Sequence, residues 1–169
     1  MAENPFPEPP RRAGPGLVRR VGETFAATPV GSRFMRALVP LDRRLLSRTG
    51  GRLSVLGPAG LQMLLLTTIG RKSGQRRQSP LVYTRDAERI FLFGSNFGQA
   101  GHPAWSSNLM ADPNCWVTLA GKEIPVVATL LAGDEYERVQ RMFMEYVKVY
   151  PAYRTRTDRR VRIFALTPR

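Results

Sequence analysis

The chain has 169 residues, of which 43% are hydrophobic and 23% are charged, and this is the usual size of one globular domain with its own core. Lysine and arginine total 26 against 13 acidic residues, so the net charge is +13 and we expect an anionic partner. Charge alone leaves nucleic acid, acidic lipid and a polyanionic small molecule open. Only Lys72, Lys122 and Lys148 are lysines. All other cations are arginines, whose planar guanidinium suits phosphate and carboxylate.

Several classes of protein do not fit the composition. The single cysteine, Cys115, excludes an internal disulfide, and its alternating apolar surroundings predict a buried side chain rather than a nucleophile. The Pro-rich start, MAENPFPEPPRRAGPG, lacks the apolar stretch of a signal peptide, and no apolar run reaches the ~20 residues of a membrane-spanning helix. We therefore expect a cytoplasmic protein that is soluble or at most bound to a membrane surface.

Residues 1–16 are rich in proline, and we predict a disordered or extended tail there. Residues 17–60 are predicted to form an N-terminal helical segment with a helix near 30–49, because apolar side chains recur at helical spacing. These apolar side chains are Phe34, Leu38, Leu41, Leu45 and Leu46. Pro40 implies a kink or two short helices, and Gly50 provides the end of the helix.

The same segment has two interpretations. The favoured one is a helix that packs on the core and turns an arginine-rich face to solvent. The alternative is a basic amphipathic segment that lies on an anionic membrane.

From Leu61 the pattern changes to that of β-strands joined by tight turns. Strands are predicted at 61–70, 77–85, 90–96 and 161–168, with two more within 115–132 around a turn at 120–122. Helices are predicted near 103–111, opened by Pro103, and near 134–149, with Asp134 as N-cap. Short strands in hairpins predict an α+β fold, a mainly antiparallel barrel with packed helices in residues 61–169. The alternation of strand and helix in a Rossmann fold is missing.

The turn GRKSGQRR, residues 70–77, concentrates positive charge between two of these strands. It is not a P-loop, because Arg71 stands where that motif needs glycine. Gly70 and Gly74 allow unusual backbone angles, so amide N–H groups can converge on an anion there. The neighbouring cations add charge-assisted hydrogen bonds, although a basic hairpin tip is often merely solvated.

The chain offers little independent catalytic chemistry. His102 is the only histidine and has no second histidine, cysteine pair or acidic cluster near it, so we expect no metal site and a structural role for this residue. No nucleophile elbow of the G-x-S-x-G type and no pair of carboxylates stands in the middle of the chain. An enzyme of this kind would take its chemistry from a cofactor.

Three sequence blocks resemble one family. They are LLLTTIGRKSGQRRQSPLVY, GSNFGQAGHPAWSSNLMADP and YPAYRTRTDRRVRIFALTP, in this order between Leu61 and Pro168. Together they look like the signature of the deazaflavin (coenzyme F420)-dependent nitroreductase and quinone reductase family. The resemblance implies a split β-barrel related to flavin-binding oxidoreductases, with reduced F420 as hydride donor.

The resemblance also implies roles for individual residues. F420 carries a phosphodiester and a polyglutamate tail, and by similarity the basic turn would hold them through Arg71, Lys72 and Ser73. Along the coenzyme would lie Arg77, Gln78, Ser79, Pro80, Leu81 and Val82. The pocket for the ring would be lined by Phe93, Gly94, Ser95, Asn96, Ala104, Trp105 and Asn108.

The third block carries aromatic residues that, by similarity, bind substrate or donate a proton. Tyr150 and Tyr153 are the candidates for a catalytic role, Tyr146 also qualifies, and Arg156 stands where a third tyrosine is expected. The resemblance thus implies an F420-dependent oxidoreductase that passes a hydride to a quinone, a nitroaromatic or a similar electron-poor acceptor. The alternative is a non-catalytic carrier of F420 or fatty acid. We do not expect nucleic acid, because the cations lack regularly interleaved aromatic side chains.

Overall fold

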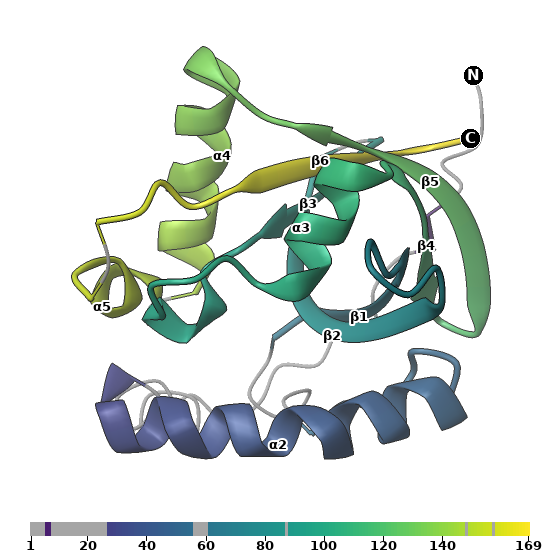
Figure 1. The fold of residues 1–169 in the computed structure, drawn as a ribbon, viewed down its shortest axis with the longest axis horizontal. Helices are drawn as coiled ribbons and strands as arrows, with labels where there is room; N and C mark the ends of the chain where they lie inside the picture. Colours follow the sequence, from purple (N-terminus) through teal and green to yellow (C-terminus); the bar gives the residue numbers. More distant parts are fainter. Residues whose placement is uncertain (1–5, 8–26, 56–60, 87, 148, 157) are drawn as a thin grey trace.

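A computed structural model describes residues 6–7, 27–55, 61–86, 88–147, 149–156 and 158–169. Six antiparallel strands close into a barrel in the order β1-β2-β3-β6-β5-β4, with the helices packed around it (Figure 1). The elements are α2 (Pro29–Arg48), β1 (Met63–Ile69), β2 (Arg76–Arg85), β3 (Ile90–Phe93), η2 (Asn96–Gly98), α3 (Ala104–Ala111), β4 (Asn114–Leu119), β5 (Lys122–Leu130), α4 (Gly133–Tyr146), α5 (Tyr150–Arg154) and β6 (Ile163–Pro168). The predicted antiparallel barrel with packed helices is confirmed.

The barrel closes through its last strand. Hairpins join β1 to β2, β2 to β3 and β4 to β5, as the short strands and tight turns of the sequence predict. β6 then enters between β3 and β5, where Phe91 faces Ala165 and Leu130 faces Phe164. Because β1 also pairs with β4, no described strand leaves an unpaired edge on the barrel.

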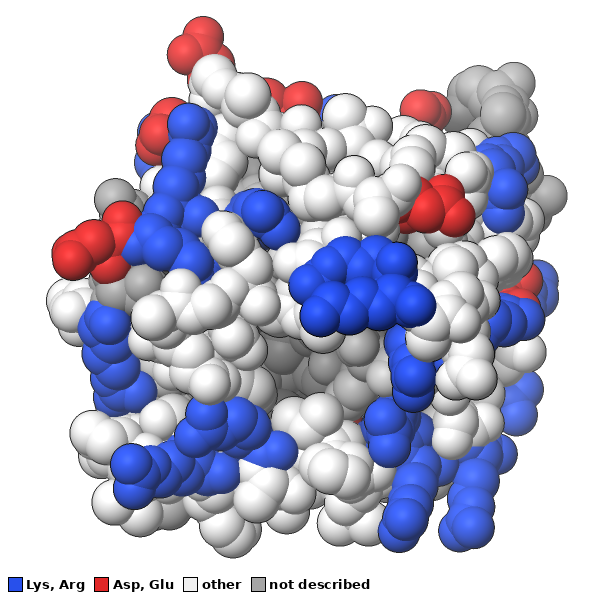
Figure 2. Space-filling model, viewed as in Figure 1, with Lys and Arg blue, Asp and Glu red and all other residues white. Residues whose placement is uncertain are grey.

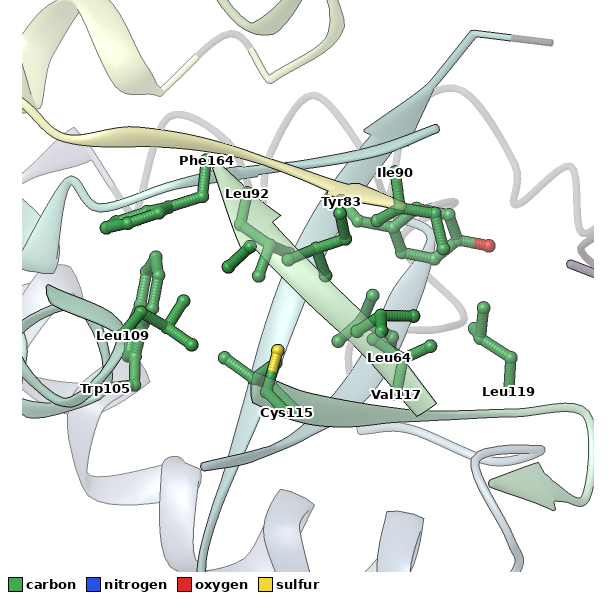
Figure 3. Close-up of a cluster of buried hydrophobic side chains, with 14 of the residues drawn as sticks. Leu64, Tyr83, Ile90, Leu92, Trp105, Leu109, Cys115, Val117, Leu119 and Phe164 are labelled. Carbon is green, nitrogen blue, oxygen red and sulfur yellow. The ribbon is translucent and has the colours of Figure 1, made fainter. Parts of the chain in front are cut away.

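Alternate residues of each strand fill the interior of the barrel (Figure 3). On β4 the buried side chains are Cys115, Val117 and Leu119, and α3 adds Trp105, whose ring lies 5.8 Å from that of Phe164. Burial raises the pKa of the Cys115 thiol to about 12. Cys115 therefore packs as a small hydrophobic side chain, as predicted.

The N-terminal helix is one continuous element with Pro40 inside it, and not the two short helices that Pro40 allowed. Thr28 caps it by accepting a hydrogen bond at Oγ1 from the Gly31 amide at 2.9 Å. The helix contacts β1 and β2 and lies across one side of the barrel (Figure 1). The expected packing on the core is confirmed, but Phe34 and Leu41 point outward and are about half exposed.

Two predictions about the last helices are wrong in detail. Ala132, not Asp134, is the N-cap of α4, and Asp134 lies in the first turn, where its charge favours the helix dipole. α4 ends at Tyr146, and a second short helix, α5, begins at Tyr150 with Pro151 in its first turn. Proline suits that position because it needs no intrahelical N–H donor.

Of the predicted tail at residues 1–16, only Phe6 and Pro7 lie within the described residues. Phe6 is buried against the barrel core, and the carbonyl of Pro7 accepts a hydrogen bond from Arg85 at 3.1 Å. The predicted boundaries near residues 16 and 60 fall outside the described ranges. Among the helices that the structure describes, none is both long and apolar enough to cross a membrane.

Candidate functional site

A cavity of about 490 Å³ opens between α2 and the barrel. Its walls come from α2, the middle of β2, the segment from Phe93 to Phe97, and α5. The predicted site residues that line it are Ser79, Pro80, Leu81, Val82, Phe93, Ser95, Asn96, Trp105, Tyr150 and Tyr153. Most of these are apolar or aromatic, and the volume is that of a small-molecule site.

A more open basic groove adjoins the cavity along β2. Predicted residues Arg77 and Gln78 line it together with Arg43 of α2 and Arg76. Glu123 also lines it and holds Arg76 in an ion pair of 2.7 Å. Figure 2 shows lysine and arginine side chains gathered around a hollow between α2 and the barrel. The two recesses together offer an apolar slot beside a cationic groove.

The turn from Gly70 to Gln75 projects its side chains into solvent. Arg71, Lys72 and Ser73 are exposed, and the turn depends on Gly74, whose φ of +66° favours glycine. Hydrogen bonds within the protein engage the amides of Gly70, Arg71, Ser73, Gly74 and Gln75. The turn therefore presents side chains, rather than these five amides, to an anion.

Three predicted ring-pocket residues do not line the cavity. Ala104 is exposed at the start of α3, and Gly94 is buried, with its amide donating to Arg162 at 2.9 Å. Asn108 is buried and joins α3 to β1: Nδ2 donates to Thr68 at 3.0 Å, and Oδ1 accepts from the Arg71 amide at 3.2 Å. Asn108 thus fixes the position of the basic turn, and its contact with a cofactor ring stays a prediction.

The two candidate tyrosines stand in an aromatic cluster on the cavity wall. The Tyr150 ring stacks on Phe93 at 4.8 Å and lies 6.2 Å from Tyr153, whose ring in turn meets Phe97 edge-on at 6.1 Å. Burial raises the pKa of both phenols, more than a hydrogen bond with Ser95 lowers that of Tyr150. Both hydroxyls stay protonated near neutral pH and can donate hydrogen bonds.

Sequence reasoning missed Arg159, which holds the loop that follows β3. Its guanidinium donates to the carbonyls of Gly94 at 3.1 Å, Ser95 at 2.9 Å and Gln99 at 3.3 Å. Its Nη1 also lies 3.2 Å from Nδ1 of His102, whose pKa is lowered by burial and by the charges of Arg162 and Arg159. Neutral His102 accepts this contact, which agrees with the structural role expected for it.

The contribution of α2 to the site was also missed. Met35, Leu38, Val39 and Pro40 form the wall opposite β2, and Asp42 adds a buried carboxylate. The helical periodicity was visible in the sequence. Nothing in it indicated which side of the helix would cover a cavity.

The arrangement defines a class of protein. A slot lined by aromatic and aliphatic side chains suits a flat ring, and the cations that adjoin it suit a long anionic tail, so the described residues fit F420. An antiparallel barrel with such a site fits an F420-dependent oxidoreductase, and the comparisons with known proteins agree.

The sequence profile of the F420H(2)-dependent quinone reductase family matches residues 34–168, so the chain belongs to this family. It is 30% identical over 135 residues to an F420H(2)-dependent quinone reductase of Mycobacterium tuberculosis. The aligned region covers 78% of this chain and 91% of the relative. A solved F420-H2 dependent reductase is 32% identical, with a TM-score of 0.57 over 62% of this chain and 92% of its own. A structure described as a domain-swapped dimer is 29% identical, with a TM-score of 0.60, and the match covers 80% of this chain and 98% of the other. The protein is an F420-dependent oxidoreductase, and F420 is its cofactor.

Proposed function

We propose that this protein reduces a quinone or a similar electron-poor acceptor within the cavity between α2 and the barrel. The observation that carries the proposal is a basic groove lined by Arg43 and Gln78 next to an apolar cavity lined by their sequence neighbours Asp42 and Ser79, with Tyr150 and Tyr153 in the cavity wall. The groove suits the anionic part of the coenzyme, and the cavity suits two stacked planar groups. Nitroaromatic compounds share the flat, electron-poor character of quinones and belong to the same proposal.

Reduced F420 supplies a hydride when it is bound. The chain contributes binding, orientation and protection from water. Arg71, Lys72 and Arg77 would bind phosphate and carboxylate groups through charge-assisted hydrogen bonds. The apolar walls of β2 and α2 would exclude water and hold the reactants face to face. Tyr150 or Tyr153 would donate a hydrogen bond to the acceptor oxygen on which charge develops, and a phenol or water supplies the proton.

A direct assay tests this function. Purified protein is titrated with oxidised F420, and then reduced F420 is mixed with soluble quinones, nitroaromatics and unsaturated lipids while its oxidation is followed. We expect saturable binding and fastest turnover with quinones. A Val82→Phe variant narrows the cavity and should slow turnover, whereas Val127→Phe on β5, which lies outside the cavity, should not. Binding without turnover of any acceptor would favour the alternative, a non-catalytic carrier.

We also propose that α2 rests on an anionic membrane surface. Val30, Phe34 and Leu41 are spaced four and seven residues apart, which places them on one helix face, and all three are more than half exposed. Arg33, Arg44 and Arg48 are exposed beside this stripe. An apolar stripe with flanking arginines suits the interface of an acidic bilayer, where lipophilic quinones dissolve.

Sedimentation with vesicles tests this contact. The protein should bind phosphatidylglycerol vesicles and not phosphatidylcholine vesicles, and salt should weaken the binding. Phe34→Ser with Leu41→Ser should abolish it, whereas Leu130→Ser, an exposed leucine of β5, should have no effect. Equal vesicle binding by the parent and the double variant would contradict the proposal. A parent that is a dimer in ultracentrifugation, with a monomeric double variant, would also contradict it, because a second copy of the chain would then cover the stripe.

A further inference from the structure

Asp42 is a buried carboxylate in the wall of the cavity. It lies on α2 and is only 4% exposed, although most of the wall around it is aliphatic or aromatic. Its Oδ1 accepts a hydrogen bond from the Val55 amide at 2.8 Å. Among the residues that the structure describes, no cation forms an ion pair with it. A carboxylate can accept about four hydrogen bonds, so most of its capacity remains available.

A buried carboxylate needs donors. Removal of a charged group from water costs several kcal/mol unless hydrogen bonds replace the lost hydration. Carboxylate oxygens accept hydrogen bonds, and an ionised phosphate or the carbonyl of a quinone can only accept them as well. The partner of Asp42 must carry O–H or N–H groups, and a hydroxyl is the simplest such donor.

The position of Asp42 indicates which part of a ligand it meets. On α2, Arg43 lines the basic groove and the adjacent Asp42 lines the cavity. On β2, Gln78 lines the groove and the adjacent Ser79 lines the cavity. Along α2 and along β2, the lining therefore changes from groove to cavity at these two pairs of neighbouring residues. A ligand with its ring in the cavity and its anionic tail in the groove places its linker beside Asp42.

The tyrosines lie toward the other end of α2. Ser32, in the first turn of α2, accepts a hydrogen bond from Arg156 at 3.1 Å, and Arg156 lies 5.5 Å from the Tyr153 ring. Asp42 is ten residues further along the helix, which corresponds to about 15 Å at 1.5 Å per residue. The acceptor end and the Asp42 end of the site are therefore separate.

We propose that Asp42 binds the hydroxyl groups of the ribityl chain that joins the deazaflavin ring of F420 to its phosphate. The inference rests on the proposed position of the coenzyme. It assigns to α2 the recognition of a neutral polyol, distinct from recognition of the tail by the basic turn. Each hydrogen bond from a hydroxyl to a buried carboxylate is of the strong, charge-assisted kind, and a protein site built for hydroxyls rejects analogues that lack them.

Three ligands separate the contributions of ring, polyol and tail. They are F420, the ring with its ribityl chain but no phosphate, and the same ring with a methyl group in place of the ribityl chain. Dissociation constants are measured by fluorescence without any turnover. We expect the parent to prefer the ribityl compound over the methyl compound by about ten-fold or more. Asp42→Asn should reduce this preference to about two-fold. It should leave the ratio of the dissociation constants of F420 and the ribityl compound unchanged.

Two further variants complete the test. Glu137→Gln removes an equal charge from the exposed surface of α4 and should behave as the parent. Lys72→Ala with Arg77→Ala should change the ratio between F420 and the ribityl compound and leave the polyol preference intact. An unchanged polyol preference in Asp42→Asn would overturn the inference. If Asp42→Asn does not fold, the parent alone still tests the inference, because equal affinity of the parent for the ribityl and methyl compounds would overturn it. A parent that does not bind F420 at all would instead reject the proposed function.

Discussion

Nη2 of Arg159 donates a hydrogen bond of 2.9 Å to the carbonyl oxygen of Ser95. Ser95 lines the cavity, and Arg159 belongs to the segment that leads to β6, so this contact ties one wall of the site to the strand that closes the barrel. The same guanidinium reaches Gly94, Gln99 and His102. A single planar group therefore fixes the whole loop.

Arg159→Lys should loosen this loop. An ammonium is a compact charge and cannot span four acceptors that a guanidinium reaches together. We expect F420 affinity to fall by about ten-fold and amide exchange to accelerate in residues 94–102. Fluorescence titration and hydrogen exchange measure the two effects. Arg141→Lys, an exposed position on α4, should change neither. Unchanged exchange in Arg159→Lys would show that the loop is held by other contacts.

Lys72→Ala combined with Arg77→Ala should weaken F420 binding far more than it lowers thermal stability. Both cations are exposed, Lys72 on the turn and Arg77 at the start of β2, so they add little to folding. A charge-assisted hydrogen bond to a bound anion contributes about 1.5–3 kcal/mol, so we expect a loss of affinity of ten-fold or more.

The matched control for this pair is Lys122→Ala with Arg141→Ala, which removes the same charge from other exposed positions. Titration of F420 at two salt concentrations separates local contacts from the general field of the protein. Equal affinity losses in both double variants would mean that net charge, and not the basic turn, attracts the coenzyme.

The sequence predicted the barrel because hairpins are local: β1 is a short apolar run joined to β2 by a glycine-containing turn, and β4 and the middle of β5 alternate on either side of theirs. The residues of the candidate site were harder to predict from the sequence. The side of α2 that faces the barrel carries Ser32 and Asp42 as well as Leu46, while Phe34 and Leu41 face outward, so hydrophobicity alone assigns the faces incorrectly. Arg159 acts on residues about 60 positions earlier, and no local pattern reveals such contacts.

Asp86 should stabilise the protein only above acidic pH. Burial raises the pKa of Asp86, but its hydrogen bonds and ion pair with Arg89 outweigh this and leave the pKa below its ordinary value. Because the folded state lowers this pKa, the stabilisation is present above the unfolded pKa and is lost as pH falls through the folded one. Asp86→Asn should cost about 0.5–1 kcal/mol of unfolding free energy at pH 7.

Urea denaturation at pH 7 and at pH 3 measures this effect. The gap between Asp86→Asn and the parent should shrink at pH 3, because the Asp86 carboxyl is then largely protonated in the unfolded state and part of its stabilising effect is lost. Glu137→Gln on the exposed face of α4 should show no gap at either pH. A gap of the same size at both pH values would mean that packing or hydrogen-bond geometry, and not charge, explains the cost.

Tyr150 and Tyr153 should matter more for turnover than for coenzyme binding. Both line the cavity, and both have a raised pKa, so each keeps its O–H and can donate to an acceptor oxygen. Losing such a donor removes an interaction that strengthens as charge develops on the acceptor. We expect Tyr150→Phe or Tyr153→Phe to lower quinone reduction ten-fold or more, about 1.4 kcal/mol of barrier, with little change in F420 affinity.

Rates with saturating reduced F420 decide the role of the two phenols. Tyr136→Phe is the control, because this buried tyrosine of α4 lies outside the cavity and its hydroxyl accepts a hydrogen bond from Gln140. Since both candidate phenols stay protonated, neither should introduce a pH dependence between about pH 6 and pH 9. Full activity in both Phe variants would remove the tyrosines from the reaction and leave water as the proton source. A loss confined to F420 affinity would instead make their rings part of the coenzyme pocket.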